Sequence, residues 1–239
     1  MKKAATYLFS LLLIASLVFL YSFSLVKNSN KKIKKITIEF AEETNDFLTQ
    51  EMVNKLLIQN NEALKNQAKS VIDLQELEHS VLSNPYIESA TVFFTIDGVL
   101  KATVKQRTPV ARISKVNSSY YIDKHGFKVP LSENYSARVM LITGAINEEN
   151  LQEFTRFVNV ILADDFLKKE IIGIHKTQDN EFILSVRSGQ YKIEFGSLDE
   201  TNVKFKKLKA FYNTAFVDKT IEQYKTINLK YHNQVVCAK

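Results

Sequence analysis

The sequence predicts an α+β protein with one N-terminal transmembrane helix, a domain of order β-α-α-β-β, and a C-terminal domain of mainly antiparallel sheet with helices on it. Three observations support this fold class. An uncharged apolar run occupies residues 4–26. Two helical patterns lie between a first strand and a hairpin over residues 36–107. Short strands separated by polar turns then alternate with two amphipathic helices over residues 108–239. With 239 residues, 45% apolar and 24% charged, the chain is typical of globular domains.

The apolar run at residues 4–26 is long enough to cross a bilayer. As a helix, its 23 residues would extend roughly 34 Å, against a hydrocarbon core of about 30 Å. A cleaved signal peptide is the alternative, because Lys2 and Lys3 precede the run and Ser22-Phe23-Ser24 has the small-x-small form of a cleavage site. The run exceeds the usual apolar region of a signal peptide, about 7 to 15 residues, which favours an anchor.

The charges around this run bear on its orientation. Two lysines precede it and five follow in residues 27–35, so the positive-inside rule alone would place the C-terminal side in the cytoplasm. Long following domains can be translocated regardless of nearby charge. We therefore predict residues 1–3 as a cytoplasmic tail and the body as extracytoplasmic. Residues 27–35 are then a basic linker, either a solvated spacer or a contact for anionic headgroups.

The net charge of +6 also belongs to the N-terminus. Seven of the 32 basic residues and none of the 26 acidic ones lie in the first 35 positions, which leaves 25 basic and 26 acidic residues in the rest. Binding to nucleic acid needs a basic folded surface that displaces counterions from phosphates. We therefore predict no nucleic-acid partner.

The first outer domain begins with an alternating strand over residues 36–40. Helical spacing predicts a helix over 49–59 and a second one after Asp73, whose carboxylate can accept from first-turn amides. Strands over 86–96 and 99–107 follow, and Asp97-Gly98 between them suits a type I′ hairpin turn. We expect an antiparallel three-stranded sheet with both helices on one face.

This order and two flanking motifs resemble a known domain. Asn84-Pro85-Tyr86-Ile87 opens the hairpin and Arg107-Thr108-Pro109-Val110-Ala111 closes it. After a short basic tail and one membrane span, this arrangement resembles the POTRA domain of the bacterial cell-division family FtsQ/DivIB. The resemblance implies a POTRA domain over residues 36–107.

The second half predicts further strands and two long helices. Tyr120 to Asp123 and Val129 to Leu131 flank a glycine turn at His125-Gly126. Further strands are predicted over 138–143, 171–176, 181–187 and 191–195. A helix capped by Asn147 has one unbroken apolar face, formed by Leu151, Phe154, Phe157, Val158, Ile161 and Leu162.

A last helix over residues 200–216 is predicted to bury Val203, Leu208, Phe211 and Phe216 and to turn its lysines to solvent. Its basic run, residues 204–209, is either a solvated face or a contact for an acidic partner. One continuous strand region is predicted over 226–238.

These segments extend the family resemblance over nearly the whole chain. The glycine hairpin and the following Val129-Pro130-Leu131 are similar to segments of FtsQ/DivIB, and Ile227 to Tyr231 resembles the closing segment of the family. Asn228 stands there where Asp is usual, and Lys230 where Arg is usual. The resemblance implies that residues 108–239 form an FtsQ-type β domain.

The sequence contains no pattern typical of catalysis or of a bound cofactor. The histidines, at positions 79, 125, 175 and 232, have no second His or Cys at metal-ligand spacing. Cys237 is the only cysteine, so an intrachain disulfide is excluded, and its apolar surroundings indicate a packing residue. We predict no enzyme activity, no catalytic residue, no cofactor and no metal.

Strand addition is the binding mode that the sequence favours. We expect the last strand to be an open sheet edge, to which a partner segment could pair through main-chain hydrogen bonds. The resemblance implies that this partner is the small bitopic protein FtsB, which itself pairs with FtsL. Carried over by position, the contact residues are Lys230, Tyr231, His232, Asn233, Gln234, Val235 and Val236. Tyr231 and Val235 could instead fill the core, since alternate side chains of a strand face opposite ways.

The resemblance also implies the expected function. It is a non-enzymatic scaffold of the divisome, anchored in the inner membrane at the septum, that links early and late division proteins. Components of the septal peptidoglycan synthase are possible further partners, with the POTRA half as a second binding surface. The alternatives are another POTRA-containing factor for envelope assembly or secretion, and a membrane-anchored envelope enzyme or ligand-binding domain.

Overall fold

The computed structural model describes residues 2–41, 47–59, 68–116, 118–232 and 234–239. The chain divides into two compact units, Met1–Gln106 and Arg107–Lys239. Each unit has its own sheet.

The chain starts with a long helix, α1 (Lys2–Ser29). It includes the predicted span 4–26 and extends beyond it at both ends. The segment Tyr7–Ser29 is long and apolar enough to cross a membrane, with a mean hydropathy of 2.3, and its apolar stretch is not buried within the protein. These properties fit a single-pass membrane anchor.

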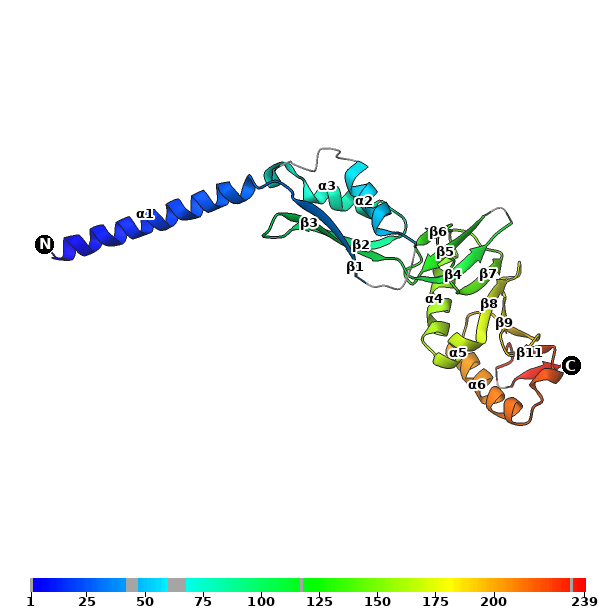
Figure 1. The fold of residues 1–239 in the computed structure, drawn as a ribbon. Coiled ribbons are helices and arrows are strands. Elements are labelled where there is room, and N and C mark those ends of the chain that lie inside the picture. The colour runs from blue at the N-terminus through cyan, green and yellow to red at the C-terminus, as the bar shows by residue number, and fades with distance from the viewer. Residues whose placement is uncertain (1, 42–46, 60–67, 117, 233) are drawn as a thin grey trace. The chain divides into compact units, whose positions relative to one another are not determined.

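The rest of the first unit has the predicted order of strand, two helices and two strands. Its elements are β1 (Lys35–Phe40), α2 (Gln50–Gln59), the short 3-10 helix η1 (Lys69–Val71), α3 (Leu74–Leu82), β2 (Ile87–Phe94) and β3 (Val99–Gln106). Asp73 caps α3 as predicted, because its carboxylate accepts from the backbone N–H groups of Gln75 and Glu76 at 2.9 and 3.1 Å. The two α-helices lie on one face of the sheet (Figure 1).

Two details of this unit differ from the prediction. The sheet order is β1-β3-β2, and β1 pairs with β3 in parallel, so the sheet is not fully antiparallel. The segment from β1 to β2 supplies the long connection that parallel strands need. The hairpin turn is also not type I′, which requires positive φ at both central residues. Thr95 N–H donates to Val99 O at 2.9 Å across a three-residue loop, in which only Gly98 has positive φ, +86°.

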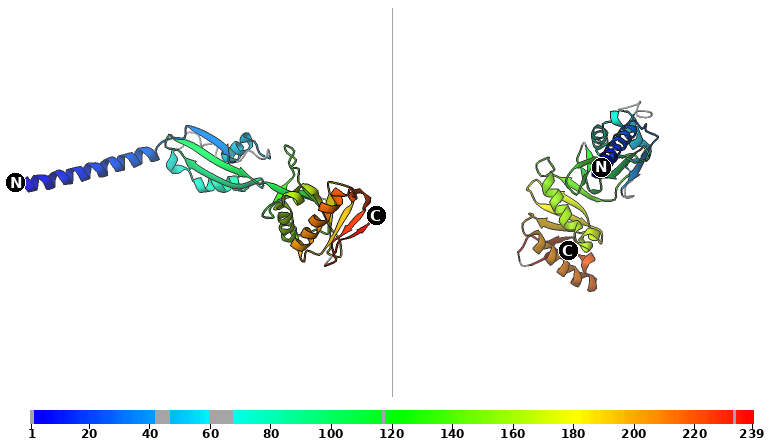
Figure 2. Two further views of the ribbon diagram at one scale, coloured as in Figure 1. Left: turned by 90° about the horizontal axis from the view of Figure 1, so that it is seen from below. Right: turned by 90° about the vertical axis from the view of Figure 1, so that its left-hand side faces the viewer.

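The second unit is a mixed nine-stranded sheet with helices on one face (Figures 1 and 2). Its strands are β4 (Pro109–Ser114), β5 (Ser119–Asp123), β6 (Lys128–Pro130), β7 (Met140–Gly144), β8 (Ile171–Lys176), β9 (Phe182–Val186), β10 (Lys192–Gly196), β11 (Thr226–Asn228) and β12 (Val236–Ala238). Its helices are α4 (Leu151–Leu162), α5 (Asp165–Glu170), α6 (Thr201–Val217) and the 3-10 helix η2 (Ile221–Gln223).

The sheet order is β12-β11-β10-β9-β8-β7-β4-β5-β6. Three neighbouring pairs are parallel, namely β4 with β7, β7 with β8, and β10 with β11. The other five described pairs are antiparallel. The predicted fold class, α+β with a mainly antiparallel second sheet, is therefore confirmed.

The core of this unit forms between the sheet and the helices. The predicted apolar face of α4 is buried at Leu151, Phe154, Phe157, Val158 and Ile161. Gly144 lets β7 end close against β8, since its φ is +99° and an added Cβ would lie 2.0 Å from the carbonyl oxygen of Lys176.

Several predictions for the second unit were wrong. Asn147 is not the cap of α4; it exchanges side-chain to backbone hydrogen bonds with Asn150, after which the helix begins. Helix α6 faces the core differently than predicted, because Val203 and Phe216 are exposed and Lys204 is buried. Strand β4 and helix α5 were not predicted.

The predicted continuous strand over 226–238 is two short strands, β11 and β12, paired with each other. The chain leaves β11 at Asn228, whose side-chain Oδ1 accepts from the backbone N–H of Lys230 at 2.9 Å. Such a local turn competes with strand pairing. Residues 229–232 and 234–235 therefore belong to a connection and not to a strand.

Candidate partner-binding edge at the C-terminal strand

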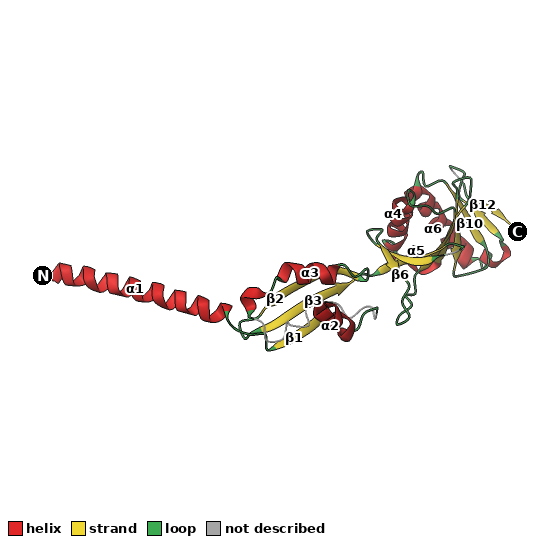
Figure 3. Cartoon of the chain, turned by 90° about the horizontal axis from the view of Figure 1, so that it is seen from above, coloured by secondary structure: helices red, strands yellow, loops and turns green. Residues whose placement is uncertain are grey.

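Strand β12 forms one margin of the nine-stranded sheet. Among the described strands its only neighbour is β11, with Thr226 opposite Ala238, Ile227 opposite Cys237 and Asn228 opposite Val236. Figure 3 shows β12 at the outer side of the sheet, beside the C-terminal end of the chain. An edge of this kind presents backbone groups that a further strand can pair with.

The hydrogen bonds of β11 identify which backbone groups of β12 are available. The carbonyl oxygen of Ala238 accepts from the N–H of Lys225 at 2.8 Å, so it faces β11. Successive residues of a strand direct their N–H and C=O groups to opposite sides. The N–H and C=O of Cys237 therefore face the open side of β12.

The side chains around the edge are divided between core and surface. Cys237 and Val235 pack against the core, whereas Val236 is 40% and Tyr231 51% exposed. Burial raises the pKa of the Cys237 thiol, which keeps it protonated near neutral pH. Cys237 is thus a packing residue whose backbone lies at the edge.

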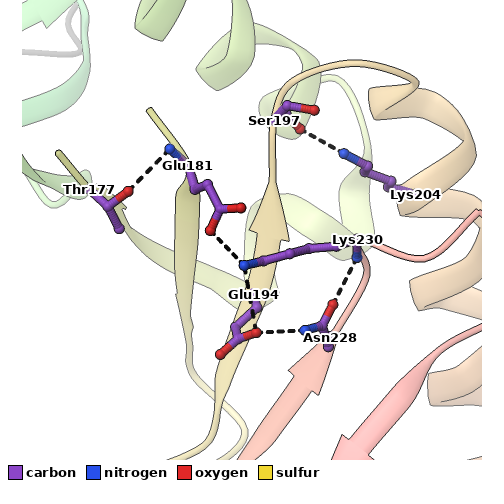
Figure 4. Close-up of polar contacts among 7 residues, drawn as sticks. All are labelled: Thr177, Glu181, Glu194, Ser197, Lys204, Asn228 and Lys230. Carbon is purple, nitrogen blue, oxygen red and sulfur yellow. Dashed lines mark hydrogen bonds and ion pairs between the residues drawn. The ribbon is translucent and has the colours of Figure 1, made fainter. Parts of the chain in front are cut away.

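A polar network holds the chain where it leaves β11 (Figure 4). Lys230 Nζ lies 2.5 Å from Glu181 Oε2 and 4.0 Å from Glu194 Oε2. Asn228 Nδ2 donates to Glu194 Oε2 at 2.6 Å. The hydrogen bond to Glu181 raises the pKa of Lys230.

Gly196 makes room for this network. An added Cβ at Gly196, where φ is +74°, would lie 2.9 Å from Lys230 Cγ. The Lys230 side chain can therefore cross the end of β10 and reach Glu181, which directly precedes β9.

Helix α6 holds the connection between β11 and β12. Lys207 Nζ donates to the carbonyl oxygens of Leu229, Tyr231 and His232 at 3.4, 2.5 and 3.2 Å. His232 Nδ1 lies 3.0 Å from Glu200 Oε2 at the start of the same helix. The ammonium group of Lys207 thus binds three backbone carbonyl groups of the connection.

The predicted basic run on α6 is only partly a solvated face. Lys204 is 7% exposed, and its Nζ donates to Ser197 O at 2.7 Å above the ring of Phe195. Burial lowers the pKa of Lys204. Lys207 is engaged by the connection, and Lys209 pairs with Asp164 at 2.5 Å. Lys206 is exposed.

The Lys207 contacts make a first prediction. Lys207→Met keeps the length of the side chain and removes its donors, so amides of residues 229–232 should exchange about tenfold faster with solvent. Hydrogen exchange of the full chain in detergent, read by mass spectrometry, measures this. Lys206→Met is the matched control and should leave the same peptides unchanged. Equal exchange in both variants would show that Lys207 does not hold the connection.

The seven residues predicted to contact a partner are spread over the connection and the start of β12. Lys230, Tyr231 and His232 lie in the first part of the connection, and Gln234 and Val235 directly precede β12, which starts at Val236. Asn233 lies outside the described residues. Sequence reasoning missed Cys237 as the outward-facing backbone position, and Lys207, Glu181 and Glu194 as supports. Only a correct strand register could have identified them.

Metal-ligating side chains do not cluster in the described part of the chain. No group of three His, Cys, Asp or Glu side chains within the described ranges is arranged to hold a metal ion. His175 Nδ1 instead shares a hydrogen bond with Thr143 Oγ1 at 3.0 Å.

Comparison with protein families assigns both parts of the chain. The family model described as FtsQ/DivIB, C-terminal related, matches residues 108–238. The chain belongs to the FtsQ/DivIB family. The model described as a POTRA-like domain matches residues 31–105. Among curated proteins, no match was found.

The family assignment fits the structure of this FtsQ/DivIB protein. Both matched segments lie after the apolar helix α1 and each falls within one compact unit. FtsQ/DivIB domains are non-catalytic scaffolds of cell division, so the chain is assigned to septation, and the apolar helix α1 fits a single-pass membrane anchor.

Proposed function

We propose that this FtsQ/DivIB protein is a divisome scaffold that binds an FtsB-like protein by strand addition at β12. The partner segment would pair with the outward-facing N–H and C=O of Cys237 and continue along residues 230–236. The observation that carries this proposal is the single neighbour of β12 among the described strands. The partner would in turn be paired with an FtsL-like protein.

The proposal includes a location. The span 4–26 would anchor the protein in the inner membrane, with residues 1–3 in the cytoplasm, residues 27–35 as a linker, and the domains over 36–107 and 108–239 outside the cytoplasm. From the septum, the scaffold would connect early and late division proteins, including components of the septal peptidoglycan synthase. The apolar, exposed helix α1 supports an anchored protein.

Depletion of the protein followed by microscopy tests the division role. Cells should continue to elongate and replicate without completing septa, and form filaments. Affinity purification of the membrane-extracted full chain should carry along a small bitopic protein of FtsB type. Normal septation during depletion would overturn the proposal.

A factor for envelope assembly or secretion is the second candidate, favoured by the POTRA-like match over residues 31–105. The three-stranded sheet of this domain has β1 and β2 at its margins, and an extended segment can add to a sheet edge. This function predicts loss of outer-membrane or secreted proteins on depletion while septa still form. The same depletion experiment therefore separates the two candidates.

A further inference from the structure

We propose that a second surface of the C-terminal domain, a basic groove where β4, β7 and β8 begin, binds an acidic, apolar peptide segment of a partner protein. This surface is separate from the edge at β12. In the sheet order, β8 lies four strands from β12, which is about 19 Å at the usual strand spacing.

The groove has an apolar floor. Its volume is about 460 Å³. The three strands that begin here are parallel neighbours, and residues from the end of α4, from α5 and from the turn after β9 complete the lining. The apolar side chains are Pro109, Val110, Val139, Met140, Leu162, Ile171 and Ile172.

Two β-bulges shape this floor. Residues Pro109 and Ala111 of β4 lie opposite the consecutive residues Asp123 and Ile122, so Val110 is an extra residue. In the same way, the pairing of β8 with β9 leaves Ile172 as an extra residue. Bulges redirect side chains and occur often beside binding sites. Both extra residues line the groove, and Ile172 is 42% exposed.

Three cations surround the floor. Arg138, Lys168 and Arg187 line the groove, all three are exposed, and no acidic residue of the described part of the chain lines it. Among the described residues, none of the three forms a salt bridge, whereas Lys176, Lys209 and Lys230 each pair with a carboxylate. Arg187 Nε donates to Lys169 O at 2.9 Å, which fixes the position of its guanidinium group.

Charge complementarity therefore identifies the occupant. Residues 107–239 contain 20 basic and 15 acidic residues, a net charge of +5, so the surroundings of the groove also favour an acidic ligand. An extended segment with carboxylates and aliphatic side chains would satisfy both the unpaired cations and the apolar floor. A bilayer fits this groove less well than a peptide does. Its anionic headgroups form a flat surface, and its acyl chains would not enter the groove to cover the apolar floor.

Peptide binding to the full chain in detergent tests the proposal. The probe is a fluorescently labelled, capped peptide in which glutamates alternate with leucines, measured by anisotropy at about 0.15 M salt. The combined variant R138E, K168E and R187E should weaken binding about tenfold or more. The control variant K192E, K206E and K219E has the same charge change at exposed lysines and should bind within about twofold of the unchanged protein.

Further arms make each outcome decisive. Val110→Ser with Ile172→Ser should also weaken binding, and a peptide with serines in place of leucines should bind more weakly than the probe. Replacement of the three cations by glutamine is a milder variant that should lose binding even if charge reversal prevents folding. Equal losses in the groove and control variants, equal binding of the serine peptide, or no binding of the probe would overturn the proposal.

Two other occupants give distinct results that would also overturn it. Vesicles containing anionic phosphatidylglycerol should not displace the peptide; displacement that depends on Arg138, Lys168 and Arg187 would identify a membrane contact instead. The groove variants should not change the oligomeric state measured by light scattering; dissociation of a dimer would identify a second copy of the chain as the occupant.

Discussion

Replacing Cys237 by proline is expected to lower the affinity for an FtsB-like partner about tenfold or more, because proline removes the N–H donor and its ring occupies the edge. The carbonyl of Ala238 faces β11, so the amide of Cys237 faces away from it. Proline is tolerated on edge strands where the missing N–H faces solvent. The C-terminal domain should therefore remain folded. Binding of the purified partner to the full chain in detergent measures the effect.

Two controls show whether the backbone is responsible. Cys237→Ala removes the thiol and keeps the N–H, so partner affinity should stay within about twofold of the original. Val236→Pro removes a donor on the side that faces β11, and should lower the melting temperature by separating β11 from β12. Equal partner affinities for Cys237→Pro and Cys237→Ala would contradict strand addition at this residue.

Phe157→Ala is expected to destabilise the C-terminal domain by about 3 to 5 kcal/mol. Phe157 is 2% exposed, and its ring centroid lies 5.5, 5.0 and 5.8 Å from those of Phe182, Phe195 and Phe205. The ring therefore joins α4 to two strands and to α6. Its loss would leave a cavity among aromatic rings that cannot close without moving the helices.

Denaturant unfolding of the full chain measures this loss. The chain has no tryptophan, and seven of its ten tyrosines lie in residues 107–239, so tyrosine fluorescence follows mainly the C-terminal domain. Val160→Ala on the same helix is the control; Val160 is 37% exposed and should lose less than about 1 kcal/mol. Similar losses of unfolding free energy for the two variants would show that Phe157 is not a central residue of the core.

Periodicity predicted most of the elements because their apolar faces match the regular spacing of helices and strands. The face of α4 is an example, with its buried residues at helical spacing. Helix α6 shows the limit of this reasoning. Its core-facing side includes Lys204, which is buried through a hydrogen bond to Ser197 O and a contact with the Phe195 ring. Because the prediction assumed that every lysine of α6 faces solvent, it assigned the wrong side of the helix to the core.

Strand pairing could not be deduced from local patterns. The parallel pairing of β1 with β3 depends on how the chain returns after two helices, and short strands such as β12 depend on their neighbours. For the candidate site, the sequence located the open edge near the C-terminus, but the outward-facing amide of Cys237 and the Lys207 support required the register. Averaging charge over the whole body also concealed the net charge of +5 in residues 107–239.

Hydrogen exchange at β12 is the most direct measurement for the binding mode, made on the full chain with and without an FtsB-like partner. The free protein should exchange the Cys237 amide quickly and the Val236 and Ala238 amides slowly, because only the latter two face β11. Partner binding should slow the Cys237 amide as well. If that amide remains fast in the saturated complex, the partner does not add a strand at β12.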